Sequence, residues 1–245
     1  NAFFSGVLFF EKEEFCWELT SKIKLTNFVS PCSLEYFDRY SLDLLREEYP
    51  NIPLHAEAAL FFEEDVADQK DYDATLDARV EFLADKNILL DESWFAQDQN
   101  DVLVFHEFRH QIPMLVNEKN SRAGREKIGT DMAVPDKFFN DMMTFYNKTL
   151  FGKGLPYVIF GHLGDNHLHI NLLPDSSQQK LAESLYDELA RKIISWDGTV
   201  SAEHGIGKKK KKYFYEMVGK ENIEDLKRIK NALDPQARLG RGNIL

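Results

Sequence analysis

Two β-rich runs separated by only four residues constrain the fold of this chain more than any other feature of its sequence. The first run is PYVIFGH, the second is HLHINLLP, and Leu163-Gly164-Asp165-Asn166 joins them. Strands joined by so short a loop can only be antiparallel neighbours, because a parallel pair needs a crossover of about a dozen residues. The sequence therefore predicts an antiparallel β-hairpin that belongs to a sheet.

Strand and helix patterns mix along the rest of the chain without the strict alternation of a doubly wound parallel sheet. Residues 2–10 and 57–64 are apolar, strand-like runs, and each is followed by a helical pattern. The first ninety residues therefore resemble two strand–helix units. Residues 98–119 form another helical pattern, which Pro113 should bend or end because proline has no backbone N–H.

The C-terminal part continues the same mixture. The stretch GTVSAEHGIG (198–207) is expected to be a short strand that leads into a glycine-bounded turn. Helical patterns follow and end near Leu233, before Asp234-Pro235. We predict one α+β domain over residues 1–245, with an antiparallel or mixed sheet covered by helices.

The composition is typical of a soluble globular protein, with 43% hydrophobic and 29% charged residues. The apolar runs are far too short to form a transmembrane segment. A formal net charge of −11 argues against a nucleic-acid partner. Two cysteines without a disulfide pattern favour a reducing, cytoplasmic setting. We interpret the lysine run 208–212 as the solvated start of a helix.

The hairpin carries three histidines, His162, His167 and His169. Because side chains alternate along a strand, His167, His169 and Asn171 share one face, and His162 lies across the mouth of the loop from His167. Cross-strand neighbours lie about 5 to 8 Å apart, so two imidazoles can reach one metal ion. The pattern amounts to half of a metal site, which still needs a carboxylate or thiolate from elsewhere.

The stretch SAEHGIG (201–207) offers the missing carboxylate in Glu203, next to His204. A set of two histidines and one glutamate with open positions is typical of a site where a metal polarises a substrate oxygen. Two other interpretations stay open from spacing alone. The histidines either hydrogen-bond loops only, or they bind a small carboxylate together with Asn171 and no metal.

Arg109 lies at the rim of an expected apolar helix face formed by Phe105 and Phe108. The alternative is that Arg109 is a surface arginine that pairs with Glu107.

Nucleotide-binding motifs are not recognisable, because GIGK (205–208) lacks the other Walker residues and no G-x-G-x-x-G follows a strand. A G-x-S-x-G elbow is also absent, so a hydrolytic serine is unsupported.

Several stretches together resemble one known family. They are GHLGDNHLHIN, SAEHGIG, GTDMAVP and NALDPQARLGRGNIL, and the likeness covers nearly the whole chain. The chain resembles the C-terminal domain of FAD-linked oxidases of the vanillyl-alcohol oxidase superfamily, of the D-lactate dehydrogenase, glycolate oxidase flavin subunit and D-2-hydroxyglutarate dehydrogenase type. The resemblance implies a ferredoxin-like antiparallel sheet with helices, a substrate and cap domain, and an N-terminal FAD-binding domain absent from this chain.

The resemblance also implies roles for single residues. His162, His169 and Glu203 would hold a divalent metal such as zinc, and His204 would be the catalytic base. Arg109 and Asn171 would contact the substrate. The implied reaction oxidises a D-2-hydroxy acid to its 2-oxo acid with FAD as hydride acceptor, and this part alone would have no turnover. An unidentified electron acceptor would reoxidise the flavin, and it would be the only link to a membrane surface.

The chain departs from the family pattern at the hairpin turn. The usual GDGN is GDNH here, so Asn166 replaces a glycine and His167 an asparagine. Gly129 stands where a lysine is common, which leaves Lys127 as a candidate substitute.

Two functions of other classes remain as alternatives: a stand-alone metal-dependent hydrolase and a non-catalytic ferredoxin-like binding module.

Overall fold

The computed structural model describes residues 2–25, 31–66, 72–84 and 87–245. Their strands form one sheet with the order β4-β1-β3-β2-β7-β8-β5, and β6 also pairs with β8. The strands are Ala2–Phe10 (β1), Pro31–Asp38 (β2), Ala58–Val66 (β3), Trp94–Phe95 (β4), Ile128–Gly129 (β5), Met132–Ala133 (β6), Tyr157–His162 (β7) and His167–Leu172 (β8). Every neighbouring pair in this order is antiparallel, which confirms the predicted sheet.

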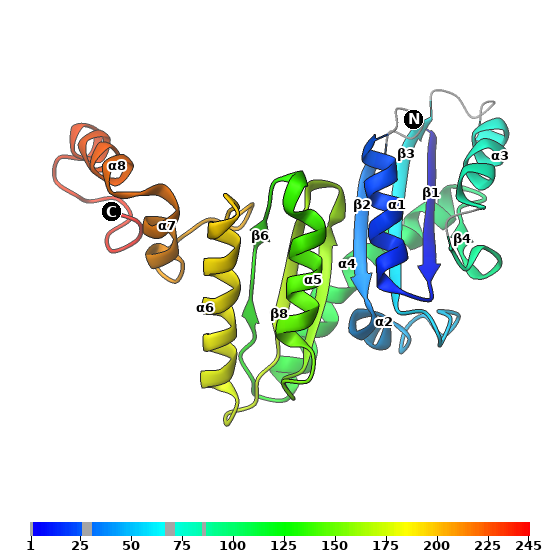
Figure 1. Cartoon of the computed structure of the whole chain (residues 1–245), viewed down its shortest axis with the longest axis horizontal. Helices are drawn as coiled ribbons and strands as arrows, with labels where there is room; N and C mark the ends of the chain where they lie inside the picture. The colour runs from blue at the N-terminus through cyan, green and yellow to red at the C-terminus, as the bar shows by residue number, and fades with distance from the viewer. Residues whose placement is uncertain (1, 26–30, 67–71, 85–86) are drawn as a thin grey trace.

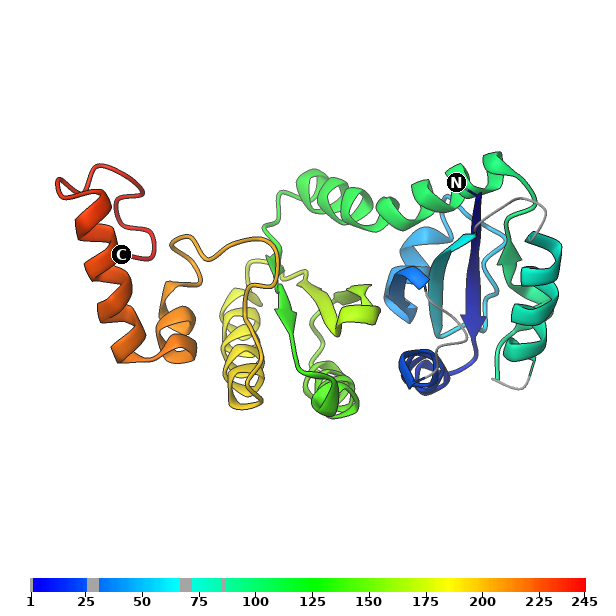
Figure 2. The same cartoon turned by 90° about the horizontal axis from the view of Figure 1, so that it is seen from above.

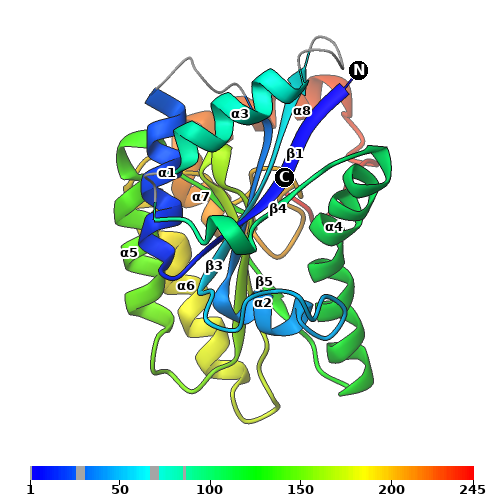
Figure 3. The ribbon, with the colours of Figure 1, turned by 90° about the vertical axis from the view of Figure 1, so that its right-hand side faces the viewer.

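Helices cover both faces of the sheet (Figures 1, 2 and 3). One face packs against α1, α5 and α6, and the opposite face packs against α2 and α4. The helices are Glu13–Leu25 (α1), Arg39–Leu45 (α2), Tyr72–Leu83 (α3), Gln99–Arg122 (α4), Phe139–Leu150 (α5), Gln179–Ser195 (α6), Lys211–Val218 (α7) and Lys220–Leu233 (α8). Figure 1 shows α7 and α8 extending beyond α6, away from β1.

The first half of the sheet has the ferredoxin-like arrangement. In β4-β1-β3-β2, the strands β1 and β2 are joined through α1 and flank β3, while β3 and β4 are joined through α3 and flank β1. The expected two strand–helix units were therefore incomplete, because β2 and α2 were missed. Ser33 and Glu35 interrupt the apolar pattern of β2, although Glu35 is buried. The helical pattern that follows the second strand-like run covers residues 74–87. The observed helix α3 ends at Leu83, and residues 85–86 lie outside the described residues.

Pro113 does not end α4, contrary to one of the two outcomes expected from the sequence. The helix continues to Arg122. A proline inside a helix costs about 3 kcal/mol or more. Phe105, Phe108 and Ile112 are buried against the sheet, and their burial offsets this cost.

Within the described residues, no helix has both the length and the apolar character needed to cross a bilayer.

The buried Asp38 gives the fold a pH-dependent stability. Asp38 precedes α2, and its carboxylate accepts a hydrogen bond from the backbone N–H of Ser41 at 2.8 Å. Burial raises the pKa of Asp38 from 3.8 to about 7. The folded state therefore favours the protonated acid. This contribution to stability is complete below the ordinary pKa and is lost as the pH rises toward 7.

Asp38→Asn is expected to stabilise the protein at pH 8 by about 2 to 4 kcal/mol and to change little at pH 4, because asparagine also caps a helix but cannot ionise. Urea unfolding of both proteins at the two pH values measures the difference. Asp43→Asn, an exposed change on the same helix, is the control and should show no such pH dependence. An equal effect of Asp38→Asn at both pH values would contradict the prediction.

Candidate functional site

The predicted hairpin is formed by β7 and β8, and it gathers its three histidines on one face of the sheet. The register pairs His162 with His167 and Phe160 with His169, so all three side chains face the α4 side. The ring centroids are 5.4 Å apart for His162 and His167, 4.6 Å for His167 and His169, and 6.0 Å for His162 and His169. This confirms the shared face that the alternation predicted.

The altered turn GDNH keeps the geometry that a glycine would allow. Asn166 has a φ of 53°, in the left-handed region that asparagine tolerates better than most residues. Its side-chain amide donates to the carbonyl of Val134 and to Asp136, and its oxygen accepts from Lys24 at 2.6 Å. Asn166 therefore ties the hairpin turn to α1 and to the segment before α5.

A loop after α6 brings Glu203 to the histidines. The short strand expected in the stretch GTVSAEHGIG (198–207) is wrong, since only an isolated bridge between Ala133 and Thr199 forms there. The carboxylate of Asp131 holds the loop instead, accepting from the N–H of Glu203 at 3.2 Å and of His204 at 2.9 Å. The backbone hydrogen bonds that a strand would form are thus replaced by a side-chain acceptor.

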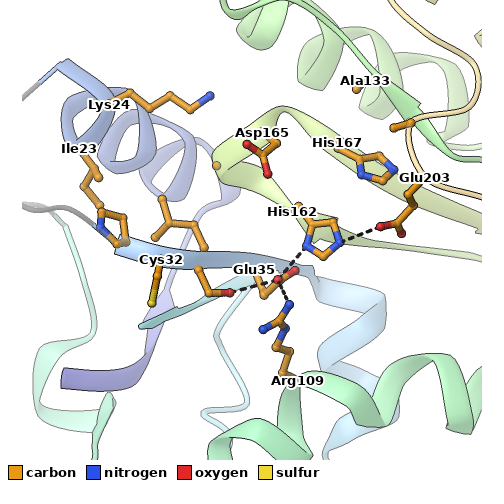
Figure 4. A pocket seen from close by; sticks show the side chains of 15 residues that line it. Ile23, Lys24, Cys32, Glu35, Arg109, Ala133, His162, Asp165, His167 and Glu203 are labelled. Carbon is orange, nitrogen blue, oxygen red and sulfur yellow. Dashed lines mark hydrogen bonds and ion pairs between the residues drawn. The ribbon is translucent and has the colours of Figure 1, made fainter. Parts of the chain in front are cut away.

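Glu203 faces Nε2 of two histidines. Its Oε2 lies 3.6 Å from Nε2 of His162 (Figure 4). Its Oε1 lies 3.2 Å from Nε2 of His169. Nδ1 of His162 is hydrogen-bonded to Glu35 at 2.8 Å, and Nδ1 of His169 to the carbonyl of Thr130 at 3.3 Å. Each Nε2 is therefore left with its lone pair toward Glu203, as a metal ligand requires.

The pKa values of the two imidazoles shift in opposite directions. The hydrogen bond to Glu35 raises the pKa of His162 above its ordinary value. Burial lowers the pKa of His169, and the neighbouring His167 lowers it further. His169 is therefore neutral near pH 7, the form in which an imidazole binds a metal.

Two cavities meet at this group. A cavity of about 400 Å³ is lined by Arg109, Lys127, Asn171 and His204, among others. A larger cavity of about 900 Å³ is shown in Figure 4. Both are lined by Glu35, Arg109, His162 and Glu203, so these four side chains form the boundary between them. Small polar ligands can reach the group from either side.

Arg109 enters the site from α4, whose apolar face contains the buried Phe105 and Phe108 as expected. Its guanidinium lies 2.8 Å from Oε1 of Glu35, not beside Glu107, and it lies 5.9 Å from the ring of Phe61. Glu35 therefore contacts both Arg109 and His162, and sequence reasoning missed it. The sequence did offer one indication: Glu35 is the single carboxylate among the apolar residues of the strand-like run LEYF (34–37), at a position that faces the protein interior.

Asn171 and Lys127 line the smaller cavity together. Asn171 is buried on β8 and pairs with Gly129 of β5. A side chain at position 129 would meet the Asn171 amide oxygen, because a Cβ there would lie 3.2 Å from it. Lys127 is half-buried, and burial lowers its pKa below the ordinary value. Related proteins commonly have a lysine where Gly129 stands here. Lys127, two residues earlier, lines the same cavity and can supply the positive charge instead.

His204 is the most exposed of the clustered imidazoles, with 59% of its side chain accessible. Its ring stacks on His169 with centroids 5.0 Å apart, and its Nε2 lies 3.2 Å from Glu203. The structure thus brings together all six residues expected from the sequence. They are Arg109, His162, His169, Asn171, Glu203 and His204.

The lysine run is only partly the solvated stretch expected from the sequence. Lys210 is mostly buried, and its ammonium donates to Asp131 at 2.7 Å and to Ser201 at 3.0 Å. Burial alone would raise the pKa of Asp131, but the hydrogen bonds from Lys210 and from the loop N–H groups hold it well below its ordinary value. Asp131 is therefore an ionised carboxylate that anchors the Glu203 loop.

Comparison with known proteins gives a consistent family. Residues 4–244 match the family described as FAD linked oxidases, C-terminal domain. The chain is 26% identical to glycolate oxidase subunit GlcD of Bacillus subtilis, in an alignment that covers 88% of this chain and 45% of GlcD. It is 32% identical to the mitochondrial D-lactate dehydrogenase [cytochrome] of Kluyveromyces lactis over 47% of its length and 20% of that protein. It is 41% identical to D-2-hydroxyglutarate dehydrogenase of Xanthomonas citri pv. viticola over 36% of its length and 20% of that protein.

Solved structures show the same fold at low sequence identity. The fold matches p-cresol methylhydroxylase with substrate bound, with a TM-score of 0.69, 15% identity, and coverage of 99% of this chain and 52% of that one. It also matches 4-ethylphenol oxidase from Gulosibacter chungangensis, with a TM-score of 0.60, 14% identity, and coverage of 99% and 53%. The chain spans about half the length of these proteins. With the family match extending over residues 4–244, the chain belongs to the family of FAD linked oxidases, C-terminal domain.

Proposed function

We propose that this chain is the substrate domain of an FAD-dependent oxidoreductase that oxidises a D-2-hydroxy acid to the 2-oxo acid. The observation that carries the proposal is the convergence of His162, His169 and Glu203 beside the guanidinium of Arg109. The relatives named for D-lactate, glycolate and D-2-hydroxyglutarate all act on 2-hydroxy acids and support this substrate class. The proposal includes an FAD-binding domain as partner, a cytoplasmic setting and a separate electron acceptor.

The donor set fits a divalent metal such as zinc. Two imidazole nitrogens and a carboxylate match the ligands of catalytic zinc sites, and the second nitrogen of each imidazole is held by Glu35 or Thr130. His162, His169 and Glu203 would hold the ion. Such an ion, when bound, supplies Lewis acidity toward an oxygen of the substrate.

Arg109 would bind the carboxylate of the substrate. A guanidinium has five N–H donors, and the contact with Glu35 leaves donors for a second carboxylate. Lys127 adds a second positive charge to the same cavity, and the amide of Asn171 adds a donor. These three groups would orient the acid so that its hydroxyl lies toward His204.

His204 would accept the proton of the substrate hydroxyl. A histidine is suited to this role because its ordinary pKa is close to neutrality. Its carboxylate neighbour Glu203 and its stacking on His169 orient the ring in the cavity. FAD, when bound, supplies the acceptor for the hydride from the carbon that carries the hydroxyl. Neither the hydrolase nor the binding-module alternative has an observation in its favour.

The test uses the protein joined to its FAD-binding domain. Under anaerobic conditions, D-lactate, glycolate or D-2-hydroxyglutarate should bleach the flavin absorbance, and L-lactate should not. The stereospecificity follows if Arg109 and His204 hold the carboxylate and the hydroxyl at separate, defined positions. Failure of all D-2-hydroxy acids to reduce the flavin, or hydrolysis of esters without flavin, would refute the proposed function.

Arg109→Met is expected to raise KM for the D-2-hydroxy acid about 10- to 100-fold, because one charge-assisted hydrogen bond contributes about 1.5 to 3 kcal/mol. Steady-state kinetics with and without the substitution measure the change. Arg122→Met is the control, since Arg122 lies on the same helix but is exposed and pairs with Glu118. An unchanged KM would show that Arg109 does not bind the substrate.

A further inference from the structure

We propose that His167 is a fourth metal ligand, so that this chain holds its ion with three imidazoles and one carboxylate. The proposal rests on the metal site proposed above. One ring nitrogen from each of His162, His167 and His169 and one carboxylate oxygen of Glu203 all lie within 4.8 Å of one another. His167 is buried, lies directly opposite His162 in the hairpin and faces the same side of the sheet.

Asp131 determines which nitrogen of His167 is available. Nε2 of His167 lies 2.9 Å from Oδ1 of Asp131. Asp131 also accepts from Lys210, Ser201 and two backbone N–H groups, so it is an ionised acceptor. Because an ionised carboxylate can only accept, Nε2 of His167 must carry the proton. Nδ1 of the neutral ring is then left with its lone pair, as in a metal ligand.

All three hairpin imidazoles follow the same rule. His162 is held through one nitrogen by Glu35, His169 by the carbonyl of Thr130, and His167 by Asp131. Histidines that bind a metal almost always donate their other N–H to a carboxylate or a backbone carbonyl. A histidine that only filled space on the sheet would not need a buried carboxylate oriented by a lysine. The arrangement around His167 is therefore that of a ligand with its supporting acceptor.

A competing ligand set can be set aside on the same contacts. Asp131, His169, Glu203 and His204 also offer atoms within 4.8 Å of one another. In that set, both oxygens of Asp131 already accept hydrogen bonds, from His167 and Glu203 on one side and from Lys210, Ser201 and His204 on the other. A metal bound by Asp131 would lie beside the Lys210 ammonium, whose charge repels it. In the part of the chain that the structure describes, no lysine or arginine is hydrogen-bonded or ion-paired to a member of the set with His167, and the nearby Arg109 pairs with Glu35 instead.

The fourth ligand has a consequence for metal choice. Three imidazoles and one carboxylate favour zinc, cobalt or nickel over magnesium and calcium, which prefer oxygen ligands. His162, His167, His169 and Glu203 would then hold the ion with four donors instead of three. His167 therefore predicts tighter binding and sharper selectivity than a site with His162, His169 and Glu203 alone.

The test compares Zn²⁺ affinity of the untagged chain with that of His167→Gln, measured by competition with a chelator. The amide of glutamine can still donate to Asp131 but removes the imidazole lone pair. This variant therefore separates ligation from support of the loop. We expect Zn²⁺ to bind at least about 100-fold more weakly, because loss of an outer partner alone typically costs 10- to 100-fold. The visible spectrum of the Co²⁺-loaded chain should also change in band position and intensity.

His106→Gln is the matched control. His106 also pairs through Nε2 with a carboxylate, that of Glu63, but it lies outside the cluster, so Zn²⁺ affinity should not change. Thermal unfolding without metal establishes that each variant is folded, and His167→Asn repeats the measurement if the glutamine variant is not. Equal Zn²⁺ affinity and an unchanged Co²⁺ spectrum for His167→Gln would overturn the proposal and leave the three-ligand site standing. A wild-type chain that binds neither ion would refute the metal site itself, and His167 with it.

Discussion

Glu203→Gln is expected to lower the affinity of the chain for Zn²⁺ by at least about 100-fold, since loss of an outer partner alone typically costs 10- to 100-fold. Glu203 supplies the negatively charged donor of the cluster, and its oxygens face Nε2 of both His162 and His169. A neutral amide keeps the size of the side chain but removes that charge. In the protein joined to its FAD-binding domain, flavin reduction by the D-2-hydroxy acid should fall in parallel.

Glu216→Gln is the control for this change. Glu216 has a similar exposure, 42% against 44% for Glu203, and it contacts Arg191 instead of the histidines. Its substitution should alter neither Zn²⁺ affinity nor flavin reduction. The measurements are competition titration with a chelator and stopped-flow flavin absorbance. If Glu203→Gln binds Zn²⁺ as well as the parent chain, the carboxylate is not a ligand and the proposed metal site is wrong.

His204→Gln is expected to lower the rate of flavin reduction about 10²- to 10⁴-fold, the usual contribution of a positioned general base. Zn²⁺ affinity should stay close to that of the parent chain, because His204 lies beside the ligands and not among them. The imidazole contacts Glu203 and stacks on His169, but 59% of its side chain is exposed toward the cavity. Glutamine keeps polarity at this position and cannot accept a proton near neutral pH.

The split between kcat and KM separates the role of His204 from a structural one. Loss of a positioned base should lower kcat for the D-2-hydroxy acid and change its KM little, whereas a disturbed cavity would raise KM as well. His55→Gln is the control, since His55 is also about half exposed and pairs with Glu92 far from the cluster in sequence. A loss of Zn²⁺ affinity as large as that of Glu203→Gln would identify His204 as a ligand instead of the base.

Features that depend on neighbouring residues were predictable from the sequence. The four-residue loop between two β-rich runs predicted the hairpin, and alternation predicted the face shared by His167 and His169. The helix end before Asp234-Pro235 was also found where expected, at Leu233. These features follow from backbone geometry over a few residues, which a single stretch of sequence encodes completely.

Contacts between segments that are distant in the chain could not be predicted from the sequence. Glu35 reaches His162 across 127 residues, and Lys210 reaches Asp131 across 79. In the sequence, Glu35 interrupts an apolar run and Lys210 belongs to a charged run, so both resemble solvent-exposed residues. Their pairing depends on β2 lying beside β7 and on the loop after α6 folding onto β6 and β8. A short strand was expected in the stretch 198–207 because local propensity favours one, whereas hydrogen bonds to Asp131 hold that segment as a loop.

The sequence alone determined the hairpin, the face that carries its histidines, and the resemblance that brings Glu203, His204 and Arg109 into one site. Only the tertiary structure decided which nitrogen of each imidazole is free, because that depends on acceptors supplied by other segments: Glu35 from β2 for His162, and Thr130 and Asp131 from the stretch between β5 and β6 for His169 and His167. A ring nitrogen binds a proton or a metal according to its hydrogen-bond partner, and that partner is fixed by packing rather than by position in the chain.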